Sequence, residues 1–98
     1  MTYAETLAEF CVGPAITAPP PLAMERMKIY ALDTLAVILA GATADSSQRI
    51  LKAFPPGENG PASVFGGGGR LSEGEAALVN GAMAHALELD DDHRLAVL

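Results

Sequence analysis

The chain has 98 residues and a formal charge of -6, from 6 basic and 12 acidic side chains, and half of its residues are hydrophobic. Such an acidic chain lacks the basic surface that binding to nucleic acid or to an anionic membrane requires. The length allows one small domain or part of a larger one, and the hydrophobic share excludes a disordered tail. A single cysteine, Cys11, cannot form an internal disulfide, and we interpret it as a small, buried or half-buried hydrophobic side chain.

Targeting and cofactor signals are absent from the sequence. No basic segment precedes an apolar run at the N-terminus, and the most apolar stretch, residues 29–42, is shorter than the roughly 20 residues that span a bilayer. We therefore expect no signal peptide, no transmembrane helix and a cytoplasmic location. His85 and His93 are not spaced as ligands on a zinc-binding helix, and we expect no metal or other cofactor.

The first half of the chain predicts two helices joined by a proline-rich segment. Residues 2–11 carry apolar side chains at helical spacing, with Thr2 and Glu5 as a capping box, and the following Gly-Pro pair ends this helix. Residues 15–21 are interpreted as an extended connector of polyproline geometry.

The main helix is predicted over residues 22–40. Beyond Tyr30 it is apolar nearly all round, so we expect it to be buried on most sides. Asp33 would then be a buried carboxylate that anchors the helix through hydrogen bonds. A shorter helix is predicted over residues 44–54, with Asp45 or Ser46 as its N-terminal cap.

A small β element and a further helix follow. Residues 61–65 have the composition of a short strand, and four glycines come directly after them. Because these glycines lack the Gly-Lys-Ser/Thr ending of a phosphate loop, a hairpin or open turn is the better interpretation. Residues 72–87 predict a helix that begins with a capping box of Ser72 and Glu75. Its many small side chains allow close helix packing, which favours a central position in a helical bundle.

The segment that follows Asn80 carries the residues suited to chemistry. On a continuing helix, His85 and Glu88 are three residues apart and face the same side. Four carboxylates fall within five residues at the predicted helix end, on Glu88, Asp90, Asp91 and Asp92. Their mutual repulsion and the negative end of the helix dipole both favour protonated forms, which suits acid–base catalysis.

Three hypotheses for this acidic segment remain open from the residues alone. The first is proton transfer at a carbon next to a carboxylate, with an acid as base and a histidine as its partner. The second is a divalent metal site, although residues 90–92 lack the alternation and glycine of an EF-hand loop. The third is a solvated acidic segment with no role.

Four blocks of the sequence resemble the MmgE/PrpD family, whose best-known members are 2-methylcitrate dehydratases. The segment from Asn80-Gly81 through His85 to His93 resembles the family pattern Asn-Gly-x-x-x-His-x-Leu-Asp-Phe-Asp-Asp-Thr-His. Residues 7–10 resemble the family's opening helix, and residues 32–41 its Leu-Asp-Thr-Leu-Gly-Val-x-Leu-Ala-Gly helix. Residues 62–66 resemble its short strand. The order and spacing of the blocks agree over nearly the whole chain.

The resemblance implies a mainly α fold, namely the N-terminal portion of a large helical-bundle domain with a small β-turn or hairpin element. Residues 1–98 would then be the incomplete N-terminal part of that domain, within a protein of some hundreds of residues that is commonly a homodimer. Family members act on small di- and tricarboxylates, by dehydration of 2-methylcitrate, decarboxylation of cis-aconitate or epimerisation of iminodisuccinate, without an iron–sulfur cluster.

Carried over residue by residue, the resemblance implies an active-site wall made by the acidic segment. Glu88 stands where the family usually has Asp, and Asp92 where it often has Thr, whereas Asp90, Asp91 and His93 match directly. We predict catalytic roles for Glu88, Asp91 and His93, and substrate-binding roles for His85, Asp90 and Asp92. The predicted function is thus an N-terminal fragment of a lyase or isomerase that removes a proton alpha to a carboxylate, inactive alone. The alternative is a non-catalytic helical interaction module or a truncated remnant.

Overall fold

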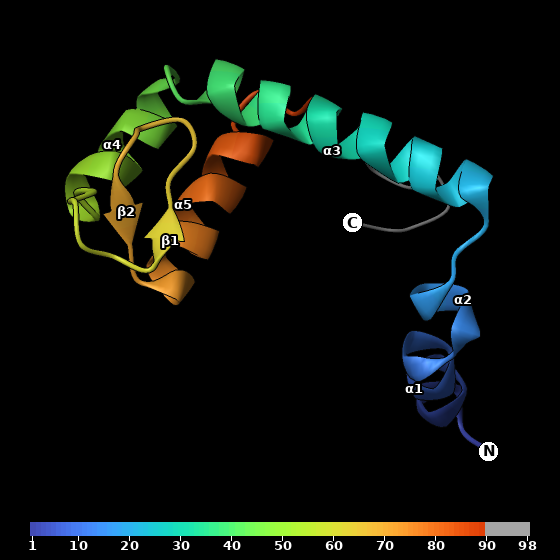
Figure 1. Cartoon of the computed structure of the whole chain (residues 1–98). Helices are drawn as coiled ribbons and strands as arrows, with labels where there is room; N and C mark the ends of the chain where they lie inside the picture. The colour runs from blue at the N-terminus through green and yellow to red at the C-terminus, as the bar shows by residue number, and fades with distance from the viewer. Residues whose placement is uncertain (90–98) are drawn as a thin grey trace. The chain divides into compact units, whose positions relative to one another are not determined.

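The computed structural model describes residues 1–89 and is mainly helical, with a small antiparallel hairpin (Figure 1). This confirms the predicted fold class of helices plus a hairpin. The chain divides into two compact units, Met1–Tyr30 and the residues from Ala31 onward. The division falls inside the long helix α3 (Pro21–Gly41). Each unit is therefore described by itself.

Helix α1 (Tyr3–Val12) begins where the capping residues predict. The Thr2 hydroxyl accepts a hydrogen bond from the Glu5 backbone N–H at 3.2 Å, and the Glu5 carboxylate accepts one from the Thr2 N–H at 2.6 Å. These two bonds satisfy donors that a helix start leaves without intrahelical partners. At the other end the N–H of Gly13 donates to the Phe10 carbonyl.

The segment after α1 differs from the prediction. Instead of an extended connector over residues 15–21, Pro14–Thr17 form the short helix α2, and only the residues between Thr17 and Pro21 connect it to α3. Pro14 is the first residue of α2, where its missing N–H costs nothing and its ring sets a helical φ angle. None of the residues of α1 and α2, all of which are described, is buried. Cys11 is exposed, so its predicted burial was wrong.

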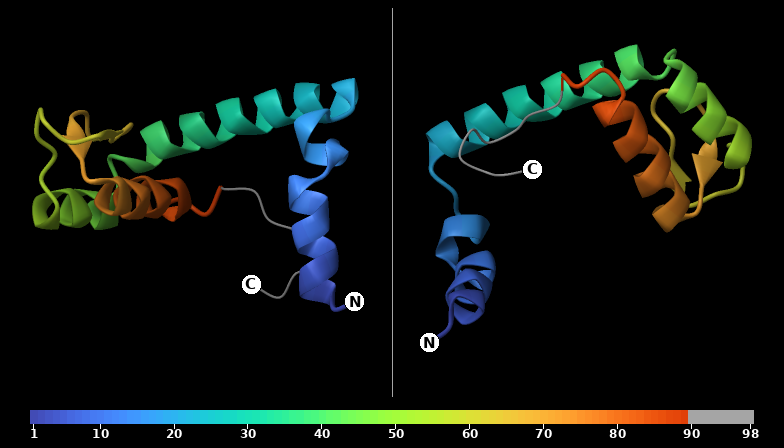
Figure 2. Two further views of the ribbon diagram at one scale, coloured as in Figure 1. Left: turned by 60° about the horizontal axis from the view of Figure 1, so that its bottom comes forward. Right: turned by 180° about the vertical axis from the view of Figure 1, so that it is seen from behind.

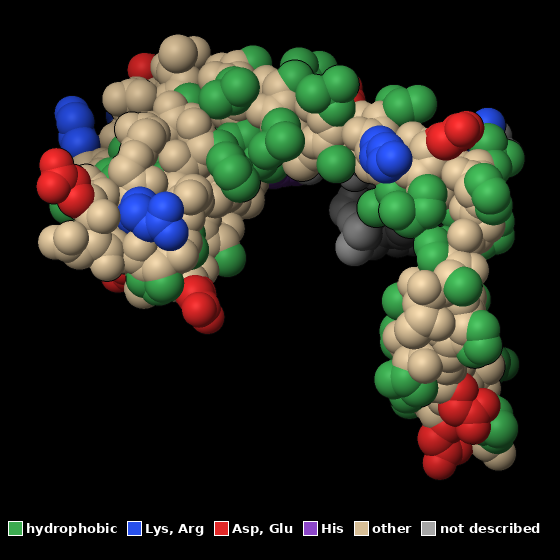
Figure 3. Space-filling view, viewed as in Figure 1, with side chains coloured by type: hydrophobic (Ala, Val, Ile, Leu, Met, Phe, Trp, Pro, Cys, Tyr) green, Lys and Arg blue, Asp and Glu red, His purple; other side chains and the backbone are tan. Residues whose placement is uncertain are grey.

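Helix α3 spans 21 residues, one more at each end than predicted, but its burial was predicted wrongly. Its buried residues are Val37, Ile38 and Gly41, all near its C-terminal end. Leu32 is 71% exposed and Asp33 is exposed as well, so Asp33 is not the buried anchor that the apolar pattern suggested. Figure 3 shows hydrophobic side chains at the surface along this helix.

Helix α4 (Asp45–Ala53) lies in the second unit, and it begins without the predicted cap. Ala44 occupies the N-cap position, and no side chain hydrogen-bonds to the first turn there, so neither Asp45 nor Ser46 is the cap. The amide of Gln48 instead donates to the Ala42 carbonyl at 2.7 Å and ties α4 to the end of α3.

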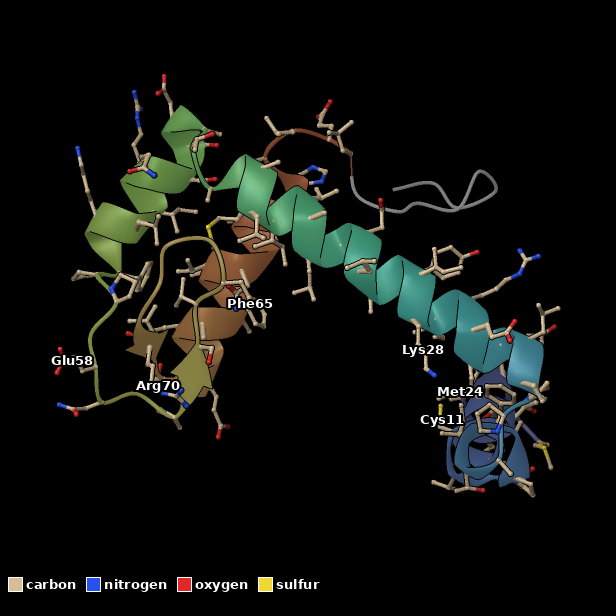
Figure 4. All side chains as sticks on the ribbon, turned by 45° about the horizontal axis from the view of Figure 1, so that its top comes forward. Cys11, Met24, Lys28, Glu58, Phe65 and Arg70 are labelled. Carbon is tan, nitrogen blue, oxygen red and sulfur yellow. The ribbon has the colours of Figure 1, made fainter. Side chains whose placement is uncertain are left out.

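Strands β1 (Ala62–Ser63) and β2 (Arg70–Leu71) form the antiparallel hairpin predicted around the four glycines, with Ala62 opposite Leu71. Gly68 and Gly69 have φ angles of 68° and 81°, which side-chain-bearing residues rarely adopt. The Arg70 guanidinium donates to the carbonyls of Gly60 and Pro61 at 2.5 and 2.8 Å, so it braces the loop before β1 (Figure 4).

Helix α5 (Glu73–His85) is at the centre of the second unit, and both the hairpin and α4 pack against it (Figure 1). The Ser72 hydroxyl accepts from the Glu75 N–H, and it donates to the Glu75 carboxylate at 2.9 Å. Ser72 is thus the predicted cap. Ala76, Val79 and Met83 are the buried residues of the helix.

The core of this unit forms where α3, the hairpin and α5 meet. Its buried residues are Ile38, Ala42, Val64, Leu71, Ala76, Val79 and Met83. Gly41 lies so close to α5 that a Cβ atom there would collide with the Met83 carbonyl. Figure 2 shows the C-terminal ends of α3 and α5 side by side. Glycine at this position therefore lets the two backbones touch.

Within residues 1–89 no single helix has both the length and the hydropathy needed to cross a bilayer. Helices α3 and α4, bent by 86° at the break between them, meet these criteria only when taken together.

Candidate functional site

An open pocket of about 510 Å³ lies beside the C-terminal end of α5. It is lined by Ser46, Ile50, Ala82, His85, Ala86, Leu87 and Glu88. Ser46 and Ile50 come from α4, and the other residues come from the last turn of α5 and the turn after it. Two predicted site residues, His85 and Glu88, therefore line one pocket.

The turn after α5 determines how these two residues are placed. The helix ends at His85, two residues before the predicted end, so Glu88 is not on the helix. The N–H of Glu88 donates to the His85 carbonyl at 3.0 Å, and Glu88 has a φ angle of 54°. The predicted helical i, i+3 relation of His85 and Glu88 was therefore wrong, and a turn brings them to the pocket instead.

The pocket combines a few polar groups with small apolar walls. The imidazole of His85, the carboxylate of Glu88 and the hydroxyl of Ser46 are its ionisable and hydroxyl groups, and alanine, leucine and isoleucine side chains form the remainder. An imidazole and a carboxylate are groups that enzymes use as general acids and bases. None of the lining residues, all of which are described, is a lysine or an arginine.

The remaining predicted site residues lie outside the described residues, namely Asp90, Asp91, Asp92 and His93. The structure thus places two of the six predicted site residues together, and their roles stay predictions. Among residues 1–89, no three His, Cys, Asp or Glu side chains come together as metal ligands.

Comparison with protein families gives one match, to the model of the MmgE/PrpD N-terminal domain, over residues 5–98. The chain belongs to the MmgE/PrpD family. The match covers nearly the whole chain, including both His85 and Glu88, and it confirms the resemblance found in the sequence blocks. Neither a search of curated proteins nor a search of solved structures found a match.

Two residues of this MmgE/PrpD domain have structural roles that the sequence did not predict. Ser46 was considered only as a helix cap, yet it lines the pocket. Asn80 was noted as part of the Asn-Gly motif, yet its amide joins α5 to the hairpin through two hydrogen bonds. The signal in the sequence was the position of Asn80 itself, a polar residue in the middle of a largely apolar helix.

Proposed function

We propose that this chain is the N-terminal part of a lyase or isomerase that acts on small di- or tricarboxylates, in the manner of 2-methylcitrate dehydratase. Membership in the MmgE/PrpD family supports the class of enzyme. The observation that carries the proposal is the pocket in which His85 and Glu88 both take part. A pocket of about 510 Å³ is large enough for a small polycarboxylate.

The proposed reaction begins with removal of a proton alpha to a substrate carboxylate. Glu88 or Asp91 takes this proton, and His93 is the complementary acid or base. In a dehydration, the electron pair left on carbon forms the double bond as the beta hydroxyl departs, and the proton from His93 completes the water molecule. His85, Asp90 and Asp92 bind and orient the substrate. No cofactor is part of this proposal.

A polycarboxylate also needs cationic partners, which the lining residues of the pocket do not provide. We propose that they come from the rest of a larger helical domain, of which residues 1–98 are an incomplete N-terminal part. On this proposal the chain alone is inactive, and the complete protein is a cytoplasmic homodimer.

The test uses the complete protein of which this chain forms the N-terminal part, assayed against a panel of small di- and tricarboxylates. We expect turnover of at least one of them, and a loss of about 100-fold or more in kcat for Glu88→Gln or Asp91→Asn. Glu58→Gln is the matched control, because it removes the same charge from an exposed loop outside the pocket (Figure 4). Unchanged turnover in both site variants would sink the assigned roles, and no turnover of any carboxylate by the wild type would sink the enzyme proposal.

A non-catalytic helical interaction module is the alternative, and one observation favours it. Large apolar side chains of α1 and α3 are exposed, including Leu7 at 65% and Leu32 at 71%. Such faces bind partner proteins as readily as they bind other parts of the same domain. The same substrate panel separates the two functions, since a module turns over none of these compounds.

A further inference from the structure

Asn80 is a helix residue whose side chain bonds entirely to another element. It lies in α5, half-buried, and its Oδ1 accepts a hydrogen bond from the Phe65 backbone N–H at 3.0 Å. Its Nδ2 donates to the Ser63 carbonyl at 2.9 Å. One amide group thus uses both its acceptor and its donor on the backbone that leaves β1.

These two hydrogen bonds hold the backbone at the C-terminal end of β1. Between Ser63 and Phe65 lies Val64, which is 3% exposed and whose N–H donates across the hairpin to the Gly69 carbonyl. The backbone therefore bonds to the hairpin at Val64 and to α5 at the residues on either side. Ser63 and Phe65 are exposed, so these bonds are not required to satisfy buried groups. A side-chain amide has both a donor and an acceptor, so it can bond to the two flanking backbone groups at once.

Phe65 precedes Gly66, and a hydrogen bond that holds Phe65 therefore also restrains Gly66, which packs beside the core residues. A Cβ atom on Gly66 would lie 2.6 Å from the Ala42 Cβ and 2.8 Å from the Met83 Sδ, so this backbone packs tightly between α3 and α5. Met83 is fully buried, and its carbonyl leaves no space for a Cβ atom on Gly41.

The pocket is lined by residues next to Met83 in the same helical turn. Ala82 and His85 flank Met83 in the last turn of α5 and line the pocket, together with Ala86 in the turn that follows. Ala86 also lies near Gly41. The position of this wall consequently depends on how Met83 is seated between the hairpin and α3.

We infer that Asn80 is a positioning residue for the pocket. Its side chain holds the hairpin against α5 and thereby fixes the position of the last helical turn, which carries His85. This role goes beyond the proposed reaction, because it sets the geometry of the wall whatever chemistry the pocket performs. The experiment that tests this inference does not depend on enzymatic activity.

The experiment compares Asn80→Asp, Asn80→Ala and Asn59→Asp in the 98-residue chain. Asn59→Asp is the matched control, because Asn59 is exposed in the loop before β1 and undergoes the same chemical change. Near pH 7 we expect Asn80→Asp to unfold about 4–8 °C below the control, because a carboxylate cannot donate to the Ser63 carbonyl.

Lowering the pH should restore the thermal stability of Asn80→Asp relative to that of Asn59→Asp. A neutral carboxyl group accepts from the Phe65 N–H and donates to the Ser63 carbonyl, so the folded state favours the protonated form and raises the pKa of the new side chain. Stability from a raised pKa is present at low pH and is lost as the pH rises through it. The difference in unfolding temperature between Asn80→Asp and Asn59→Asp should therefore become smaller as the pH falls towards about 4. The Arg70 guanidinium, which donates to the Ser63 hydroxyl at 3.5 Å, is the charged group near this bond and is the same in both variants.

Two site-specific signals complete the test. In Asn80→Ala the backbone amide of Phe65 should exchange at least tenfold faster with solvent, and the ring signal of His85 should shift in NMR spectra. The chain has two histidines, so His93→Gln assigns the signals. If Asn80→Ala does not fold, the same two signals are compared between Asn80→Asp and Asn59→Asp near pH 7.

Two results would overturn the inference. If Asn80→Asp follows Asn59→Asp at every pH, the amide is not a clamp. If Phe65 exchange accelerates while the His85 signal keeps its position, Asn80 holds the hairpin but does not position the pocket.

Discussion

Single side chains decide where the two capped helices begin. Glu5 accepts a hydrogen bond from the Thr2 N–H, and Thr2 accepts one in return through its hydroxyl. The backbone bond of Thr2, followed by its side-chain bond, holds the pKa of the Glu5 carboxyl group below its usual range. The ionised form of Glu5 is therefore the one that supports the start of α1.

This gives α1 a predictable response to acid. Because the pKa of Glu5 is lowered in the folded state, its contribution is present at neutral pH and is lost as the pH falls through that lowered value, below the usual range of a glutamate. We expect the amide signals of Thr2 and Glu5 to report fraying of the first turn in this range. In Glu5→Gln the acid-dependent change should vanish, since an amide does not titrate; its persistence would contradict the assignment.

Caps could be predicted from the sequence because their partners are near in the chain. Thr2 and Glu5, like Ser72 and Glu75, are three residues apart, so spacing alone identifies the pair. The bonds of Asn80 reach residues 15 and 17 positions away, which depends on how the hairpin folds back onto α5. No local pattern contains that information.

Among the elements, the crossing of α3 and α5 is the most restrictive contact. The backbone of Gly41 lies against the Met83 carbonyl, where a side chain has no space. Both helices were predicted nearly to their ends from hydrophobic periodicity and caps. The end of α5 at His85 was not, because no glycine or proline marks it, and the chain turns there where Ala86 meets Gly41.

Substitution of Gly41 by alanine tests this contact. We expect Gly41→Ala to lower the free energy of unfolding by about 1–3 kcal/mol, because the helices must move apart. Urea unfolding followed by circular dichroism measures the change. Gly74→Ala is the matched control, since a Cβ atom at this position in α5 meets nothing within 4 Å, and alanine there should stabilise by up to about 1 kcal/mol. Equal effects of the two changes would refute the close crossing.

At the scale of the molecule, burial among residues 1–89 is concentrated in the second unit. The core of the second unit encloses Val79 and Met83 completely, whereas α1 and α2 bury none of their residues. Hydrophobic composition correctly predicted that α3 is a helix but wrongly predicted its burial. A sequence pattern reports which face is apolar, and only the assembled structure determines what covers that face.

The exposed apolar face of α3 has a measurable consequence. We expect the 98-residue chain to associate at micromolar concentration, because Leu32 and Leu39 are 71% and 58% exposed. Sedimentation velocity should show that Leu32→Ser shifts the distribution towards monomer without reducing thermal stability, since little buried area is lost. Glu58→Gln, in the exposed loop before β1, should leave association unchanged. A monomer at all concentrations would contradict the expectation.

At position 88 the backbone conformation favours glycine, whereas the proposed reaction needs the carboxylate of Glu88. Its φ angle of 54° belongs to the left-handed region, which glycine adopts freely and which glutamate adopts only at a cost in conformational energy. Selection for stability alone would favour glycine there, and glycine would remove the carboxylate from the pocket. A proposed active-site carboxylate at such a position thus represents a trade-off between stability and activity. We expect directed evolution for thermostability to replace Glu88 repeatedly.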